Sequence, residues 1–253
     1  MSINDLYPGD NHYRAYIGRP DQYDFMGATQ FSLCFSLGLR EKHKLLDLGC
    51  GSLRAGRFFI AYLNKGNYYG IDPNKWLIEE AIEKEIGQDL ISIKSPSFNF
   101  NNEFRIDAFN VRFDFIIAQS IFSHTGIDIV KQSVKNFSEQ LTENGVALVT
   151  FVTGVTDSTQ KGWIYPGCVE FKKKTIIKIA KENQLHCRKL SWNHPRQSWF
   201  IFSKQKKKIP SLFQSHLLSG TVLFDNALKT DLKLKLKRKI KQYLNKYFKK
   251  HNG

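Results

Sequence analysis

The feature that most constrains this chain is the stretch from Lys44 to Gly56, which reads KLLDLGCGSLRAG. A short apolar run reaches Asp47, two glycines follow at Gly49 and Gly51, and a helical pattern of apolar residues begins at Leu53. This order predicts a buried strand, a tight turn and a helix. In folds built on a parallel sheet, such a turn places backbone N–H groups and a helix N-terminus at the carboxyl edge, where nucleotide-like ligands bind.

The residues around the turn argue against two common ligand motifs. A dinucleotide-binding turn needs a third glycine three residues after the second, and Arg54 stands at that place. A phosphate-binding loop needs Gly-Lys-Ser or Gly-Lys-Thr, which does not follow here. A second predicted strand, Tyr68–Ile71, leads into Asp72 and Pro73. A carboxylate at that point can accept hydrogen bonds from both hydroxyls of a ribose.

Together the two segments resemble the cofactor site of class I S-adenosylmethionine-dependent methyltransferases, over roughly residues 20–203. The resemblance implies a Rossmann-like α/β fold, with a mostly parallel seven-stranded sheet, an antiparallel last strand and helices on both faces. It also implies S-adenosyl-L-methionine as the cofactor. A structural glycine turn in another α/β domain is the alternative. The residues implied as cofactor-binding are Asp47, Gly49, Cys50, Gly51, Arg54, Asp72, Pro73, Ala118, Gln119 and Ser120.

Composition divides the chain into three parts. Of its 253 residues, 42% are hydrophobic, which is typical of a globular domain. The net charge is +15, and residues 204–253 account for +12 of it, with fourteen lysines and arginines against two aspartates. We therefore expect a helical cover over residues 1–40, a nearly neutral cofactor-binding domain over 41–203 and a basic tail over 204–253.

Targeting, redox and metal signals are weak throughout the sequence. It contains no apolar run of bilayer length and no secretory pattern, so we expect a cytoplasmic protein. Cys34, Cys50, Cys168 and Cys187 are scattered without paired spacing, which indicates reduced thiols rather than a zinc site or a redox pair. No carboxylate cluster suggests a Mg²⁺ site, so we expect metal-independent activity.

The remaining elements of the domain follow from periodicity and turn residues. The third strand is ambiguous between Ile91–Ile93 and Phe98–Phe100, and its end places Asn101 or Asn102 near the adenine. The other predicted elements are helices over about Phe25–Leu39, Trp76–Ile86, Ile127–Leu141 and 172–184, and strands over Phe113–Ala118, Val146–Val152, Leu185–Trp192 and Ser198–Ser203.

The block after the fourth strand, QSIFSH, resembles the corresponding motif of small-molecule methyltransferases, in which a histidine matching His124 lies near the transferred methyl. It lacks the Asp/Asn-Pro-Pro-Tyr/Phe signature of methyltransferases that modify nucleic-acid bases, which argues against a nucleic-acid substrate. A hydroxyl acceptor must lose its proton, and histidine suits that role. His124 is the first candidate base and His194 the second, while a core histidine bonded to a backbone carbonyl is the alternative for His124.

The acceptor is expected to contact three regions. Tyr23 from the N-terminal cover, Trp163 and Tyr165 from the loop after the fifth strand, and Arg196 from the last hairpin are the candidate substrate residues. A buried tyrosine beneath a covering helix is the alternative for Tyr23, and a solvated turn arginine is the alternative for Arg196.

The whole pattern, including SLRAG in the first motif and HPRQSW in the hairpin, is similar to bacterial methyltransferases associated with cell-surface polysaccharide synthesis. That similarity implies O-methylation of a sugar, including a nucleotide-activated sugar for capsule or surface polysaccharide. The alternatives are an RNA methyltransferase that uses the basic tail, and an N-methyltransferase of a small amine.

The tail combines apolar residues at intervals of three and four with lysines between them, which predicts an amphipathic helix over about 228–248. Such a helix can lie on the anionic inner face of a membrane, bind the groove of a partner, or pack back on the domain. We expect the tail to bind nucleic acid less readily than it adopts one of these three roles. The sequence carries no signal for an oligomeric state.

Overall fold

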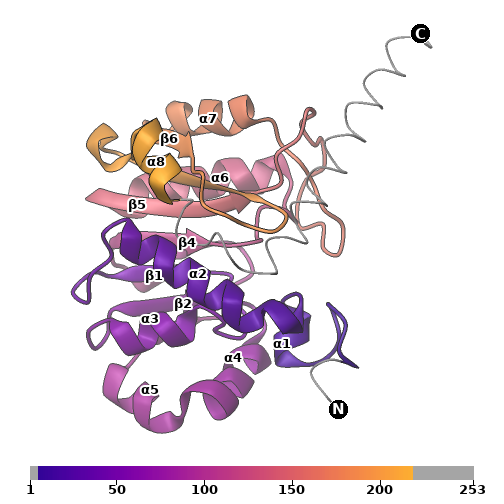
Figure 1. The fold of residues 1–253 in the computed structure, drawn as a ribbon, viewed down its shortest axis with the longest axis vertical. Coiled ribbons are helices and arrows are strands. Elements are labelled where there is room, and N and C mark those ends of the chain that lie inside the picture. The colour runs from indigo at the N-terminus through magenta and orange to yellow at the C-terminus, as the bar shows by residue number, and fades with distance from the viewer. Residues whose placement is uncertain (1–4, 219–253) are drawn as a thin grey trace.

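The computed structural model describes residues 5–218, and the helix predicted over 228–248 lies outside them. Seven strands form one sheet in the order β3-β2-β1-β4-β5-β7-β6 (Figure 1). Neighbouring strands pair in parallel except at β7, which runs antiparallel to both β5 and β6. This confirms the predicted fold, a mostly parallel seven-stranded sheet.

The elements follow one another as strand and helix along most of the chain. The strands are β1 (Leu45–Leu48), β2 (Tyr68–Ile71), β3 (Ser97–Asn99), β4 (Phe113–Ala118), β5 (Leu141–Phe151), β6 (His186–Lys189) and β7 (Ser198–Ser203). The α-helices are α1 (Tyr13–Tyr16), α2 (Tyr23–Ser36), α3 (Gly56–Tyr62), α4 (Lys75–Ala81), α5 (Gln88–Lys94), α6 (Ile127–Gln140), α7 (Lys173–Glu182) and α8 (Leu212–Leu218).

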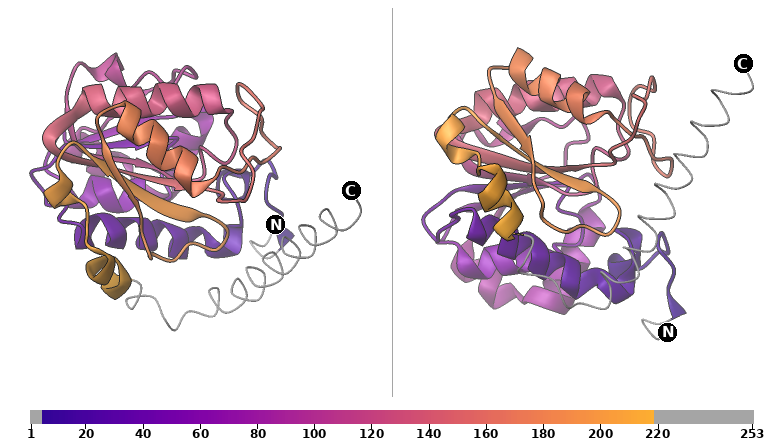
Figure 2. Two further views of the ribbon diagram at one scale, coloured as in Figure 1. Left: turned by 90° about the horizontal axis from the view of Figure 1, so that it is seen from above. Right: turned by 45° about the horizontal axis from the view of Figure 1, so that its top comes forward.

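Helices cover both faces of the sheet because its strands are apolar on both sides. Leu46 and Leu48 of β1 belong to one core, beneath α6 and α7, whereas Leu45 belongs to the other, beneath α2 and α3. The views of Figures 1 and 2 show these layers on opposite sides of the strands. Consecutive side chains of a strand point to opposite faces, so each short strand stabilises two cores at once.

The structure resolves the ambiguity in the third strand. The strand is β3, and the alternative Ile91–Ile93 is wrong because those residues lie in α5. Ile91 packs against the core while Ile93 is 64% exposed, which is a helical spacing that a run of three residues cannot reveal. The helix predicted to reach Ile86 is α4, which ends at Ala81 and continues as a π-helical turn over Ile82–Ile86.

Residues after β7 pack back on the domain. Lys204 Nζ donates to the Leu141 carbonyl, and the Ser191 N–H donates to Ser215 Oγ in α8 at 2.9 Å. The residues after Pro210 thus form a short helix, α8. Among residues 5–218, no helix is long and apolar enough to cross a membrane.

Candidate active site

A cavity of about 950 Å³ opens at the carboxyl ends of β1, β2 and β4. The strand order reverses between β1 and β4, and open α/β sheets bind ligands at such a point. Most of the sequence-predicted site residues line this cavity. They are Asp47, Gly49, Cys50, Gly51, Arg54, Asp72, Pro73, Gln119, Ser120, His124, Trp163, Tyr165 and Arg196, together with Asn101 and Asn102.

The glycine turn after β1 lines the cavity and is held against β2 by backbone hydrogen bonds. The N–H groups of Gly49 and Cys50 both donate to the Ile71 carbonyl, at 2.8 and 3.1 Å. These two N–H groups are therefore bonded within the fold, although both residues line the cavity as predicted. Gly49 has a φ of 73°, and a Cβ there would lie 2.1 Å from Ile121 Cδ1. Glycine is required because the backbone packs directly against the cavity wall.

Asp72 joins the second strand to the glycine turn. Its Oδ2 accepts from the Gly51 N–H at 2.9 Å, and its Oδ1 accepts from the Asn74 N–H at 2.9 Å. Burial raises the pKa of Asp72, and these hydrogen bonds oppose the shift. Asn74 Nδ2 also donates to Oδ1, at 3.1 Å, so Oδ2 is the oxygen that keeps a lone pair for a ligand in the cavity.

Asp47 is the most deeply perturbed acid in the site. It is 5% exposed, and Tyr68 Oη donates to its Oδ2 at 3.0 Å. Burial raises the pKa of Asp47 to about 7, and the Tyr68 hydrogen bond opposes the shift. The folded protein thus holds a proton that the unfolded chain loses near pH 4. The proton held by Asp47 therefore contributes fully to the stability of the folded protein below about pH 4, and this contribution is lost as the pH rises through 7.

We expect a cationic ligand to bind more tightly as the pH rises through 7, because it favours the ionised form of Asp47. Below pH 7, the dissociation constant of S-adenosylmethionine should fall by up to about tenfold for each unit by which the pH is raised. Calorimetry at pH 6 and pH 8 measures this change. Asp47→Asn should flatten the dependence, and an equally steep profile in that variant would show that another group titrates.

A small recess beside the cavity is lined by three arginines and no acidic side chain. Arg19 pairs with Asp21, whereas Arg54 and Arg196 form no ion pair with a carboxylate among the described residues. Burial lowers the pKa of Arg54 to about 10, and the nearby charge of Arg196 acts in the same direction. Two guanidinium groups that form no ion pair within residues 5–218 suit an anionic group of a ligand, such as a carboxylate.

His124 lines the cavity with a fixed ring orientation. Its Nδ1 lies 2.7 Å from the Gly167 carbonyl, which can only accept, so Nδ1 carries the proton. Nε2 of the neutral ring is then the atom able to accept a proton. The ring centroid lies 5.1 Å from that of Tyr165 and 6.0 Å from that of Trp163. The backbone carbonyl expected in the alternative interpretation of His124 is present, and it sets the tautomer of this cavity-lining histidine.

His194 does not meet the requirements of the second candidate base. Its Nδ1 accepts from the N–H groups of Arg196 and Gln197, at 3.2 and 2.9 Å. The side chain is 3% exposed and lines the recess rather than the main cavity. His194 therefore holds the turn that carries Arg196, and it has a structural role.

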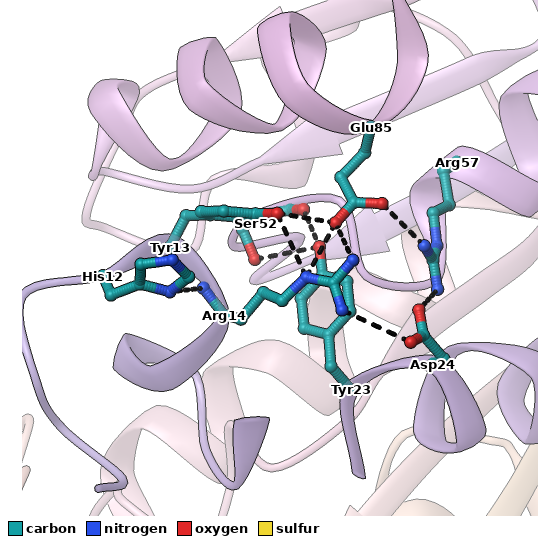
Figure 3. Close-up of polar contacts among 8 residues, drawn as sticks. All are labelled: His12, Tyr13, Arg14, Tyr23, Asp24, Ser52, Arg57 and Glu85. Atoms are coloured by element: carbon teal, nitrogen blue, oxygen red, sulfur yellow. Dashed lines mark hydrogen bonds and ion pairs between the residues drawn. The ribbon is translucent and has the colours of Figure 1, made fainter. Parts of the chain in front are cut away.

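Two other predicted residues lie behind the cavity wall. Tyr23 is fully buried, and its hydroxyl donates to the Ser52 carbonyl at 2.6 Å (Figure 3). The prediction that Tyr23 contacts the substrate is corrected, because its polar end is bonded to the backbone of the cofactor turn. Ala118 is also fully buried at the end of β4 and does not line the cavity.

Several cavity residues were not predicted from the sequence, and three polar ones are Cys168, Glu170 and Gln197. Glu170 and Cys168 alternate with Val169 and Phe171, which are buried in the core. The alternation CVEF was a readable signal for an extended segment with one face toward the cavity. Gln197 Nε2 donates to Ser120 Oγ at 2.9 Å, a contact across 77 residues that no local pattern indicates.

The comparisons with known proteins agree with this geometry. Residues 46–147 match the family model described as a methyltransferase domain. A search of curated proteins finds no match. Three solved structures show the same fold: an S-adenosylmethionine-dependent methyltransferase from Clostridium acetobutylicum, magnesium protoporphyrin IX methyltransferase from Synechocystis with S-adenosylhomocysteine, and DesVI from Streptomyces venezuelae.

These three similarities are distant in sequence. Identity is 15, 13 and 14% in that order, and the TM-scores are 0.53, 0.54 and 0.52. The matches cover 72, 73 and 75% of this chain and 91, 86 and 95% of the other chains. At this identity they show the fold, which is that of class I methyltransferases.

The methyltransferase-domain match over residues 46–147, the fold and the site support S-adenosylmethionine-dependent methyl transfer. The residues present fit the cofactor, since Asp72 offers a carboxylate, Arg54 a cation, and Gln119 a buried Oε1 without a hydrogen-bond partner. When bound, S-adenosylmethionine supplies an electrophilic methyl group on a sulfonium sulfur. The protein must hold the acceptor in line with that group and exclude water.

Proposed function

We propose that this methyltransferase acts on a hydroxyl group of a sugar, including a nucleotide-activated sugar used for capsule or surface polysaccharide. The observation that carries the proposal is the state of His124. Its Nδ1–H is bonded to the Gly167 carbonyl, so Nε2 is available to take the proton of an acceptor hydroxyl. An amine acceptor needs no such base.

The walls around His124 support a sugar acceptor. The rings of Trp163 and Tyr165 are stacked with centroids 6.4 Å apart and planes 21° apart, and they are 53% and 45% exposed. Exposed aromatic faces beside a cavity suit the apolar face of a pyranose. Glu170 lines the same cavity and is anchored by Thr156 Oγ1, which donates to its Oε1 at 2.7 Å. Its carboxylate can accept hydrogen bonds from sugar hydroxyls.

The experiment is a labelled-methyl assay with a defined set of acceptors. The purified chain is incubated with methyl-labelled S-adenosylmethionine and, separately, UDP-, GDP- and dTDP-linked sugars, free monosaccharides, total RNA and small amines. We expect label in a nucleotide sugar, recovered after acid hydrolysis as an O-methyl sugar by mass spectrometry. Label only in RNA or only in an amine would contradict the proposal.

Trp163→Ala tests whether the aromatic side chains bind the sugar acceptor that the labelled-methyl assay identifies. The Michaelis constant for the acceptor should rise by about tenfold, since the loss of about 1.4 kcal/mol of contact corresponds to that factor. The affinity for S-adenosylhomocysteine should stay unchanged. Tyr7→Ala serves as the control, because Tyr7 is an exposed aromatic residue that does not line the cavity.

A further inference from the structure

The N-terminal cover forms one wall of the cofactor cavity. Tyr16, Ile17 and Gly18, at and just after the end of α1, line the cavity, and Ile17 contacts the glycine turn at Gly51. α1 has only four residues and cannot hold itself in place. The position of this wall therefore depends on side-chain contacts between α1 and the rest of the domain.

Those contacts converge on one carboxylate. Glu85, in the π-helical turn after α4, has a side chain only 9% exposed. It accepts from Tyr13 Oη at 2.7 Å and Arg14 Nε at 2.8 Å, both in α1. It also accepts from Arg57 in α3 at 2.8 Å, and Asp24 in α2 pairs with both arginines. Figure 3 shows Arg14 and Arg57 both pointing toward the Glu85 carboxylate.

The same two arginines hold Tyr23 against the cofactor turn. The guanidinium carbons of Arg14 and Arg57 lie 4.7 and 5.1 Å from the centroid of the Tyr23 ring, within cation–π distance. The Tyr23 hydroxyl donates to the Ser52 carbonyl and receives a bond from Ser52 Oγ. Ser52 follows Gly51 directly, so a contiguous set of contacts runs from Glu85 to the turn that bounds the cavity.

We propose that Glu85 is a positioning residue for the cofactor. It fixes Arg14 and Arg57, which hold Tyr23 on the glycine turn and keep the α1 wall closed over the cavity. Glu85 does not line the cavity, so it acts only through these residues. The two arginines balance Glu85 and Asp24 in charge. Loss of the Glu85 charge therefore leaves two adjacent cations that repel each other beside the wall.

Glu85→Gln in the full chain tests the proposal, because it removes the charge and keeps the shape. We expect the dissociation constant of S-adenosylhomocysteine, measured by calorimetry, to rise by about tenfold, within the usual range of coupling between sites. The turnover number at saturating S-adenosylmethionine should change by less than about twofold, which separates cofactor positioning from chemistry. Glu79→Gln is the matched control, because Glu79 is an exposed acid on the neighbouring α4 that pairs at the surface with Lys75.

A second variant covers the case in which Glu85→Gln does not fold. Tyr23→Phe keeps the buried ring and removes only the hydroxyl bonded to Ser52, and it should also weaken S-adenosylhomocysteine binding. In the double variant the two losses should be less than multiplicative, because both residues act along one set of contacts. A lower melting temperature with unchanged affinity in both variants would overturn the proposal. Because S-adenosylhomocysteine binding needs no acceptor, that result would leave the proposed sugar substrate unaffected.

Discussion

His124→Asn should lower the turnover number by about 10² to 10⁴-fold, the range for removal of a general base. The asparagine amide can still donate to the Gly167 carbonyl, so the local backbone should keep its position. What is lost is the imidazole Nε2 that accepts the proton of the hydroxyl. Single-turnover kinetics with the sugar identified in the labelled-methyl assay measures the chemical step directly.

The cofactor affinity of this variant provides the internal control. Calorimetry should give the wild-type dissociation constant for S-adenosylhomocysteine, because His124 lies beside the aromatic pair that is proposed to bind the acceptor. His124→Ala should lose the same activity, and added imidazole should restore part of it. A loss below about tenfold in the asparagine variant would show that no base is needed, and it would favour an amine acceptor.

Asp72→Asn should weaken S-adenosylhomocysteine binding by about a hundredfold. A hydrogen bond to a charged group contributes about 1.5–3 kcal/mol, and Oδ2 can accept one from a ribose hydroxyl. The amide has only one acceptor oxygen, and it must satisfy the Gly51 and Asn74 N–H groups first. Calorimetry on the purified variant gives the affinity.

The stability of the Asp72 variant separates binding from folding. In Asp72→Asn the amide NH₂ replaces one of the two oxygens that accept from Gly51 and Asn74, so we expect a lower melting temperature, and the affinity should be measured well below it. Asp89→Asn is the control, because Asp89 is an exposed acid on α5. Wild-type affinity in Asp72→Asn would exclude the carboxylate as the ribose partner.

Local sequence was sufficient where a residue's role depends on its own strand or turn. The run KLLDLGCG predicted both β1 and the turn, because a buried strand is apolar and a tight turn needs glycine. Asp72 could be placed at the cavity because it directly follows β2. The short run at Ile91–Ile93 could not be assigned, since three apolar residues fit a strand and a helix equally well.

Roles set by distant partners could not be read from the sequence. Tyr23 and His194 are residue types common in active sites, and only their contacts with Ser52 and with the backbone of the last hairpin show that they hold structure. The sequence around Glu85 does not distinguish it from a solvent-exposed helical glutamate, because its partners Arg14 and Arg57 come from α1 and α3.

The sequence by itself determined the class of fold, the cofactor motifs and the histidine after β4, because strand periodicity and turn chemistry act over a few residues. The tertiary structure decided which polar side chains face the cavity and which are bonded behind its wall. That choice depends on hydrogen-bond partners up to 77 residues away, and burial makes those partners obligatory.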